Sequence, residues 1–287
     1  MPFIENTDHG VTYITAPNIS AAHAFTTRYG GVSSGVYESL NLGVSLGDDP
    51  GCVRENYGRL CRALKITEED FVRLNQVHGS RVIGISREQR GNLYTAAVDS
   101  ADGLITCDPG VALAVYTADC TPVLLHDPVR GAIGAVHAGW RGTAADIAGE
   151  AVRKMCEAFG CLPANINAAI GPCISKCCYE TDQDVAVALR MVLGDDADRC
   201  ITQHSVTQCS ATQFSATQFS VTRNGGKFMI DLKEANRLLL VKAGLLDVAV
   251  SGECTSCLCD KYWSHRRTKC LRGSQAAVIA IMPGYRS

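Results

Sequence analysis

Residues 111–138 read VALAVYTADCTPVLLHDPVRGAIGAVHA, and this stretch decides the fold class. It contains three apolar runs, VALAVYT, PVLLHD and GAIGAVHA, which are separated by turn signals. Short apolar runs bounded by turn residues are typical of buried strands. We therefore predict three central strands in this stretch.

Helical patterns lie on both sides of these strands. Pro50 opens CVRENYGRLCRAL, whose apolar residues recur on one face. A second helix is expected to begin near Thr143 and to end at Gly160. Two more helices are predicted in DVAVALRMVL and LKEANRLLLVKAG, and two more strands in INAAIG and AAVIAIM. Strand clusters interleaved with amphipathic helices indicate a mixed α/β sandwich.

The segments FVRLNQV and RVIGIS are rich in residues that favour strands. They are joined by His78, Gly79 and Ser80, which resembles a short turn. We predict a β-hairpin here.

Length and composition bound the class of protein. The chain has 287 residues, of which 46% are hydrophobic and 20% charged, as expected for one globular domain spanning residues 1–287. Residues 205–224 divide into SVTQC, SATQF, SATQF and SVTRN. Since this pentapeptide repeat has neither helical nor strand periodicity, we predict an inserted loop within that domain.

The charge balance and the hydropathy limit the partners. A net charge of −2 gives no basic excess for nucleic-acid binding, and no apolar stretch approaches the roughly 20 residues of a membrane span. The first residues, MPFIENTDHG, do not resemble a secretory signal. With an odd total of 15 cysteines, these features favour reduced thiols in a cytoplasmic protein. We expect small-molecule partners and a monomer or weak homodimer.

Three possible metal ligands each follow or end an apolar run: His78, Cys120 and His137. Imidazole nitrogen and thiolate sulfur suit Zn²⁺, and three protein ligands leave a fourth position open for water or substrate. The spacing is too long for a local finger motif. Two alternatives stay open: structural histidines, or a nucleophilic Cys120 with His78 or His137 as its base.

Other polar residues could bind substrate or transfer protons. Arg28 and Arg141 could hold a phosphate or an oxyanion, or lie on the solvated surface. Ser39 and Asn41 could bind a sugar or a base, or stabilise a turn. Two carboxylates, Asp102 and Asp119, could act as a general base or orient a histidine ligand. Because Asp119 adjoins Cys120 and successive strand side chains alternate, we do not require it in the same pocket.

The remaining cysteines include a CxxC pair in ECTSCLC, where Cys254, Cys257 and Cys259 lie close together. A structural zinc site would need further ligands, which Cys270 and His265 could supply. A second cluster, GPCISKCC, offers Cys173, Cys177 and Cys178. A lone CxxC pair is a weak signal, so a second metal is not predicted.

An ordered series of motifs along most of the chain resembles the YfiH-type family, described as multicopper polyphenol oxidase or laccase-domain proteins and as purine nucleoside phosphorylases. The motifs are FTTRYGGVSSGVYESLNLG, GDDPGCVRENYGRL, NQVHGS, ADGLIT, YTADCTPVLLHDP, AVHAGWRGT, AAIGPCISKCCYE, DLKEANRLLL and SHRR. The resemblance implies a four-layer α/β/β/α sandwich similar to the cytotoxic necrotizing factor toxins. It also implies one zinc ion per chain, held by His78, Cys120 and His137.

The family's activities imply the chemistry. They are phosphorolysis of adenosine, inosine, guanosine and methylthioadenosine, with phosphate as co-substrate, and deamination of adenosine. In this scheme Arg28 and Arg141 would hold phosphate, while Asp102 would serve as acid or base. Bacterial relatives are also linked to peptidoglycan editing, in which a serine is removed from the muramyl precursor, and Cys120 could act there as a nucleophile.

Two features argue against parts of the family description. A laccase needs several coppers and many histidine ligands, whereas this chain has seven histidines and no H-x-H motif, so we expect zinc rather than copper. The terminal motif, commonly close to SYRRDG-x-TGR, reads SHRRTKCLRGSQ here. We therefore assign no substrate contact to His265 or Arg266.

Overall fold

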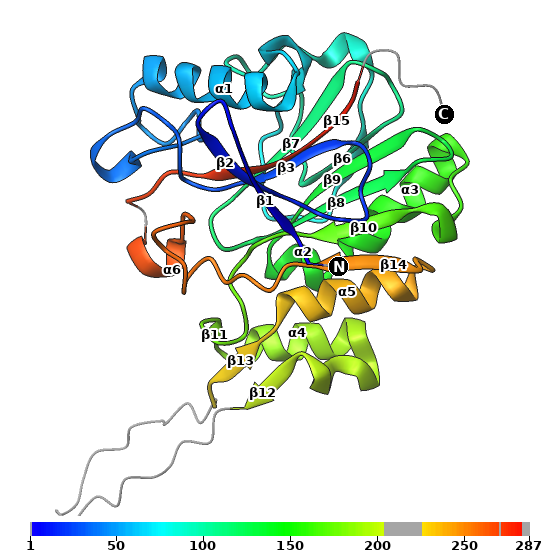
Figure 1. Ribbon diagram of the computed structural model, residues 1–287. Helices are drawn as coiled ribbons and strands as arrows, with labels where there is room; N and C mark the ends of the chain where they lie inside the picture. Colours follow the sequence, from blue (N-terminus) through cyan, green and yellow to red (C-terminus); the bar gives the residue numbers. More distant parts are fainter. Residues whose placement is uncertain (1, 204–225, 270, 283–287) are drawn as a thin grey trace, which may run out of the picture.

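The computed structural model describes residues 2–203, 226–269 and 271–282. Two six-stranded sheets form the body of this part of the chain, with helices beside them and a small third sheet at one end (Figure 1). The predicted mixed α/β class is confirmed. The pentapeptide repeat at 205–224 lies outside the described residues. Within the described ranges, no helix is both long enough and apolar enough to cross a bilayer.

The first large sheet is built around the last strand of the chain. Its strand order is β1-β2-β3-β15-β7-β4, with β1 (Ile4–Asp8), β2 (Val11–Thr15), β3 (Ala22–Thr26), β15 (Gln275–Ile281), β7 (Val111–Thr117) and β4 (Phe71–Val72). The central strand β15 is antiparallel to both neighbours, so that Ala277 lies opposite Phe25 on β3 and Val115 on β7. The AAVIAIM run is therefore a buried strand, as predicted.

The second large sheet carries the other two strands of the opening stretch. Its order is β14-β10-β8-β9-β6-β5, with β14 (Asp247–Val250), β10 (Asn167–Ile170), β8 (Thr121–Asp127), β9 (Ala132–Ala138), β6 (Gly103–Thr106) and β5 (Val82–Gly84). All three predicted strands between residues 111 and 138 are confirmed. They do not share one sheet, however: the chain leaves the first sheet after Thr117 and enters the second at Thr121.

The predicted hairpin around His78 is wrong. Strand β4 pairs in parallel with β7 in the first sheet, whereas β5 pairs in parallel with β6 in the second. The connection therefore crosses between the sheets. Gln76 fixes its first half, because its side-chain amide exchanges two hydrogen bonds, of 2.7 and 2.8 Å, with the backbone of Tyr116. Local propensity favours strand formation here, but contacts with distant strands decide the pairing.

The helices begin and end where capping residues allow. Helix α1 (Pro50–Leu64) begins after Asp49, whose carboxylate accepts hydrogen bonds from two backbone N–H groups of the first turn. The helix predicted to begin near Thr143 is two helices, α2 (Trp140–Ala144) and α3 (Ile147–Phe159). Asp146 caps the N-terminus of α3, so a new helix begins there. Gly160 ends α3 with a φ of 65°, as predicted.

Three apolar clusters show how the layers stack. Facing side chains of the two large sheets meet in one cluster that includes Leu113 on β7 and Leu124 on β8. On the outer face of the first sheet, β7 and β15 pack against α1. On the outer face of the second sheet, β8 and β9 pack against α3 and against α5 (Leu232–Lys242). The order is therefore helix, sheet, sheet and helices.

A smaller unit packs against α5. It contains the three-stranded sheet β11-β13-β12, with β11 (Glu180–Thr181), β13 (Phe228–Ile230) and β12 (Ile201–Gln203), and helix α4 (Gln183–Leu193). Its apolar side chains form a cluster of their own with α5. A last short helix, α6 (His265–Thr268), precedes β15.

The cluster between the sheets should contribute most to stability. We expect Leu113→Ala to lower the free energy of unfolding by about 2–5 kcal/mol, because the side chain is fully buried there and its loss leaves a cavity. Urea denaturation measures this change. The control is Leu162→Ala, at a side chain that is 62% exposed, for which we expect a change within about 0.5 kcal/mol. Equal losses in the two variants would contradict this packing.

Candidate metal centre and cavity

Four neighbouring strands of the second sheet bring polar residues to one end of the sheet. The starts of β8, β6 and β5 and the end of β9 lie together there, because β9 is antiparallel to both neighbours and β5 is parallel to β6. Cys120 directly precedes β8, His137 lies near the end of β9, Asp102 directly precedes β6, and His78 lies in the loop before β5. Residues far apart in the sequence therefore meet.

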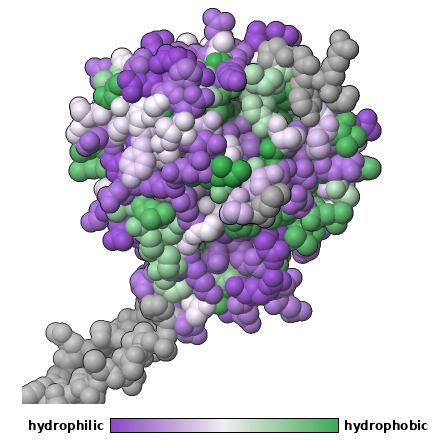
Figure 2. All heavy atoms as spheres, in the orientation of Figure 1, coloured by the Kyte–Doolittle hydropathy of each residue, from purple (hydrophilic) through white to green (hydrophobic). Residues whose placement is uncertain are grey.

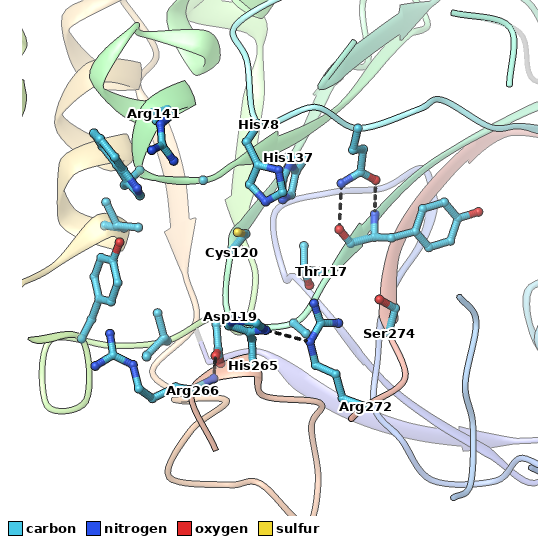
Figure 3. Close-up of a pocket in the computed structure, with 18 residues that line it drawn as sticks. His78, Thr117, Asp119, Cys120, His137, Arg141, His265, Arg266, Arg272 and Ser274 are labelled. Atoms are coloured by element: carbon cyan, nitrogen blue, oxygen red, sulfur yellow. Dashed lines mark hydrogen bonds between the residues drawn. The ribbon is translucent and has the colours of Figure 1, made fainter. Parts of the chain in front are cut away.

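The three predicted metal ligands form one group. Possible ligand atoms of His78, Cys120 and His137 all lie within 4.8 Å of one another, and the two imidazole rings are nearly perpendicular (Figure 3). Gly139 leaves room for them: a Cβ atom at this position would lie 3.2 Å from the His78 ring and 3.5 Å from the Cys120 sulfur. A larger residue would crowd the His78 ring.

Asp102 forms hydrogen bonds with both histidines of this group. Its side chain is fully buried, and one carboxylate oxygen lies 2.8 Å from Nδ1 of His137. The carboxylate also accepts backbone hydrogen bonds from Val77, His78 and Gly79. Burial alone raises the pKa of Asp102, but the hydrogen bonds from His137 and Gly79 outweigh it, so the net pKa is lowered. The residue is therefore a carboxylate that orients one ligand and fixes the loop of another.

The thiol and the imidazole beside it influence each other's charge. Burial raises the pKa of Cys120, but the neighbouring His137 and His78 lower it below the usual thiol value. Burial lowers the pKa of His137, but the sulfur of Cys120 and the carboxylate of Asp102 raise it above the usual value. Without a metal, the pair therefore favours a thiolate and an imidazolium.

The chemistry of these donors fits a zinc ion. Two imidazole nitrogens and one thiolate are ligands that Zn²⁺ binds readily. Because Nδ1 of His137 contacts Asp102, its Nε2 is left to bind a metal, and such carboxylate–histidine pairs are typical of zinc sites. The described residues therefore offer a possible three-ligand site with a position open toward the cavity.

A cavity of about 400 Å³ opens in front of these ligands. Cations and aromatic rings line it together. Arg141 stacks on Trp140 at 4.3 Å, and Arg266 lies 5.6 Å from the ring of Tyr179. Arg272 also lines the cavity, 3.5 Å from Nδ1 of His265, which is labelled with it in Figure 3. Arg141 is thus a predicted residue that does reach the cavity.

Asp119 lies at the wall of this cavity with its carboxylate already bound. Its backbone φ of 90° marks the point where the chain turns from the first sheet toward the second. The carboxylate accepts hydrogen bonds from Thr255 at 2.6 Å, from Ser264 at 3.1 Å and from the backbone N–H of Arg266 at 2.6 Å. The residue therefore anchors the loop that carries Arg266.

Three residues considered for substrate binding lie outside the cavity. The guanidinium of Arg28 stacks on Trp263 at 4.0 Å and donates to the backbone carbonyls of Glu38 and Cys259. The hydroxyl of Ser39 bonds to the backbone of Gly31, and the buried amide of Asn41 accepts from Ser274 and donates to Asp48. These polar groups hold the Gly-rich loop and its neighbours in place, so we do not propose substrate contacts for them.

Several residues of the cavity are not among those predicted from the sequence. Trp140 and Tyr179 lie within the motifs HAGWRG and CCYE, next to residues that were considered. Arg272 lies in the divergent terminal segment, and His265 and Arg266, which were set aside because of that divergence, also line the cavity. Their positions in the sequence, next to Arg141 and Cys178, are the only signal that could have predicted Trp140 and Tyr179 as cavity residues.

Comparison with known proteins agrees with this fold. The family described as "Multi-copper polyphenol oxidoreductase laccase" matches residues 22–282. A protein of Deinococcus radiodurans named purine nucleoside phosphorylase is 40% identical, over 95% of this chain and 94% of its own length. The crystal structure of YlmD from Geobacillus stearothermophilus is 36% identical with a TM-score of 0.84, covering 98% of this chain and all of that one.

A second solved structure extends the agreement. The crystal structure of YfiH from Bacillus licheniformis is 32% identical with a TM-score of 0.85, and the match covers 98% of this chain and 99% of that one. The chain therefore belongs to the laccase-like YfiH family, as its motifs indicated.

Asp102 should control how tightly the ligands hold a metal. We expect Asp102→Asn to weaken zinc binding by about 10–100-fold, because an amide cannot accept all the N–H groups that converge on the carboxylate. Competition with a fluorescent chelator measures the affinity. The control is Asp99→Asn, at an exposed carboxylate paired with Arg81. Unchanged affinity in Asp102→Asn would contradict its orienting role.

Proposed function

We propose that this protein is a zinc-dependent purine nucleoside phosphorylase that acts on adenosine, inosine, guanosine and methylthioadenosine. One observation carries the proposal: a single cavity combines the three-ligand group with arginines and aromatic rings. Its volume of about 400 Å³ falls within the range of roughly 300–1,000 Å³ that is usual for small-molecule sites. Relatives named purine nucleoside phosphorylase support the same reaction class.

His78, Cys120 and His137 would hold the zinc ion. When bound, Zn²⁺ supplies a Lewis acid at this wall of the cavity. The donor set does not suit the copper centre of a laccase, which needs a cluster rich in histidine. Among the described residues, the possible metal ligands form two groups, one with two histidines and one with none.

The arginines provide the binding site for phosphate. Arg141, Arg266 and Arg272 line one cavity, while the carboxylate of Asp119 is turned to the loop behind it. Guanidinium groups bind phosphate oxygens through paired, charge-assisted hydrogen bonds. Stacking on Trp140 orients Arg141 at the wall of this site.

The aromatic rings provide a site for the purine. Trp140 and Tyr179 line the same cavity, and their rings offer it apolar surface that a purine could contact. In phosphorolysis a phosphate oxygen forms a bond to C1′ of the ribose as the bond from C1′ to N9 breaks. The electron pair of that bond passes to the purine, which must then take up a proton.

We propose that His265 donates a hydrogen bond to the leaving purine. Its Nδ1 faces the Nε–H group of Arg272, so a neutral ring would carry its hydrogen on Nε2. The proton that the purine takes up would come from the hydrogen phosphate ion, which loses its hydrogen as it becomes the ribose phosphate ester. Asp102 is fully buried behind His137, and we therefore propose a positioning role for it in place of direct acid–base catalysis. Deamination of adenosine, in which water adds at C6 of the purine and ammonia leaves, would use the same cavity.

The reaction should depend on phosphate and on the cavity arginines. With adenosine and phosphate, we expect the zinc-loaded protein to release adenine and ribose 1-phosphate in equal amounts; inosine formed without phosphate would report deamination. Arg266→Ala should raise the KM for phosphate about 10–100-fold, since a hydrogen bond to a charged group contributes about 1.5–3 kcal/mol. Chromatography of the products measures both.

The control for that experiment is Arg153→Ala, which removes an exposed guanidinium from α3. Its KM for phosphate should equal that of the unaltered protein. Turnover that is independent of phosphate and yields neither adenine nor inosine would contradict the proposal.

A second function is favoured by one arrangement of side chains. Cys120, His137 and Asp102 lie in series, which is the order of nucleophile, base and orienting carboxylate in cysteine hydrolases. Hydrolysis of an amide in a peptidoglycan precursor would use Cys120 as the nucleophile. A metal-bound thiolate cannot serve this role well, so the two functions are mutually exclusive in one state of the site.

Thiol alkylation separates the two functions. If zinc occupies the site, Cys120 should resist iodoacetamide until a chelator is added, and Cys120→Ala should lose both the metal at this site and the nucleoside activity. Mass spectrometry of the peptides gives the extent of labelling. The exposed Cys107 serves as an internal control, because it should react equally with and without chelator. Rapid alkylation of Cys120 without chelator would favour the hydrolase.

A further inference from the structure

Two loops that are remote in sequence lie side by side next to the cavity. One follows β10 and contains residues 171–179, and the other follows β14 and contains residues 251–264. An isolated parallel bridge pairs Cys173 with Cys254, and the backbone N–H of Thr255 donates to the carbonyl of Cys173 at 3.1 Å. Each loop contributes a pair of cysteines at this junction.

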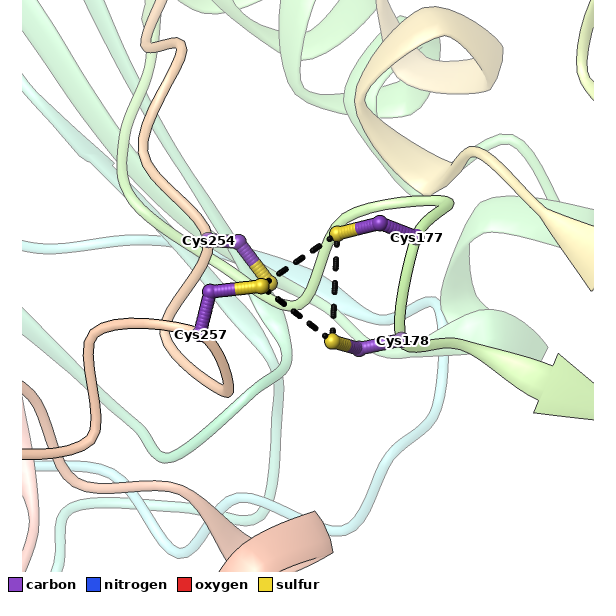
Figure 4. A group of neighbouring side chains, drawn as sticks. All are labelled: Cys177, Cys178, Cys254 and Cys257. Atoms are coloured by element: carbon purple, nitrogen blue, oxygen red, sulfur yellow. Dashed lines mark hydrogen bonds between the residues drawn. The ribbon is translucent and has the colours of Figure 1, made fainter.

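The four sulfur atoms of Cys177, Cys178, Cys254 and Cys257 converge on one point (Figure 4). All of them lie within 4.8 Å of one another. The sulfur of Cys257 is 3.5 Å from that of Cys177 and 3.4 Å from that of Cys178, and the sulfurs of Cys177 and Cys178 are 3.8 Å apart. This group is separate from the three-ligand group at the cavity.

These separations match the ligands of a single tetrahedral ion. With zinc–sulfur bonds of about 2.3 Å, the sulfurs of a tetrahedral site lie about 3.8 Å apart. A disulfide would need about 2.05 Å, well below the observed distances. An iron–sulfur cluster is larger than a single ion, because its cysteines bind different iron atoms, and a spacing within 4.8 Å leaves room for one ion only.

The surroundings of Cys254 also favour a thiolate ligand. Its sulfur is buried and accepts a hydrogen bond of 3.3 Å from the backbone N–H of Ser175. Backbone hydrogen bonds to sulfur stabilise the negative charge that a thiolate brings to a metal.

We propose that Cys177, Cys178, Cys254 and Cys257 bind a second Zn²⁺, which has a structural role. A site with four protein ligands has no open position for substrate, which is typical of structural zinc. The ion would join the two loops that supply cavity residues, with Tyr179 directly after one cysteine pair and the segment of Arg266 after the other. It therefore fixes the cavity wall without taking part in the reaction.

The grouping differs from the one considered in the sequence. There, Cys254 and Cys257 were combined with Cys259, Cys270 and His265. In the structure, Cys177 and Cys178 supply the second pair, His265 lines the cavity and Cys259 is not part of the group; Cys270 lies outside the described residues. The two pairs are about 80 residues apart in sequence, and only the neighbouring positions of the loops bring them together.

Metal content tests the proposal independently of the reaction. We expect the purified protein to contain two zinc ions per chain, one for each group, as measured by inductively coupled plasma mass spectrometry. Cys257→Ser should retain one zinc ion, the one at the cavity. When a chelator removes that ion, Cys120 should become reactive toward iodoacetamide. Cys120→Ala should also retain one. The matched control, Cys259→Ser, changes a cysteine two residues away and should keep both.

A second measurement covers the case in which Cys257→Ser does not fold. The unaltered protein, reconstituted with Co²⁺, should show the intense visible bands of a tetrahedral cobalt tetrathiolate, and these bands should persist in Cys120→Ala. A single zinc per chain that Cys120→Ala loses would overturn the proposal. So would a disulfide among the four cysteines, found by peptide mapping without reductant, or iron in place of zinc.

Discussion

The rest of the site depends on the hydrogen bonds that the buried carboxylate of Asp102 accepts. This carboxylate lies at the start of β6, receives Nδ1 of His137 from β9, and accepts three backbone N–H groups from the loop that carries His78. A carboxylate without partners would be costly to bury, and these partners offset the cost. The same hydrogen bonds orient two possible metal ligands, His137 and the loop of His78.

The crossing of the chain between the two large sheets places the third ligand. Strand β7 belongs to the first sheet and β8 to the second, and Asp119 and Cys120 lie in the short connection between them. Cys120 therefore faces the histidines, while the carboxylate of Asp119 anchors the loop of Arg266. Residues of both large sheets line the cavity beside this connection, with the possible metal ligands at one wall and the arginines and aromatic rings around them (Figure 3).

Much of this could be predicted from the sequence, since apolar periodicity reports burial directly. It located the three strands of the opening stretch, β15 and the long helices. The ends of the apolar runs also pointed to His78, Cys120 and His137, which the structure brings together as possible metal ligands. The predicted hairpin was wrong because β4 pairs with β7 and β5 pairs with β6, which are distant in the sequence. Arg28, Ser39 and Asn41 have the residue types of a binding site but satisfy their hydrogen bonds within the loops. The partners of the Cys254 and Cys257 pair depend on two loops meeting, which no local pattern encodes.

The central claim is that His78, Cys120 and His137 bind one metal ion at the wall of the cavity. An anomalous difference map, recorded on either side of the zinc absorption edge from crystals of the purified protein, tests it most directly. We expect a peak within bonding distance of the Cys120 sulfur and of one nitrogen from each histidine. An ordered site without a peak, with the Cys120 sulfur hydrogen-bonded only to His137, would contradict it.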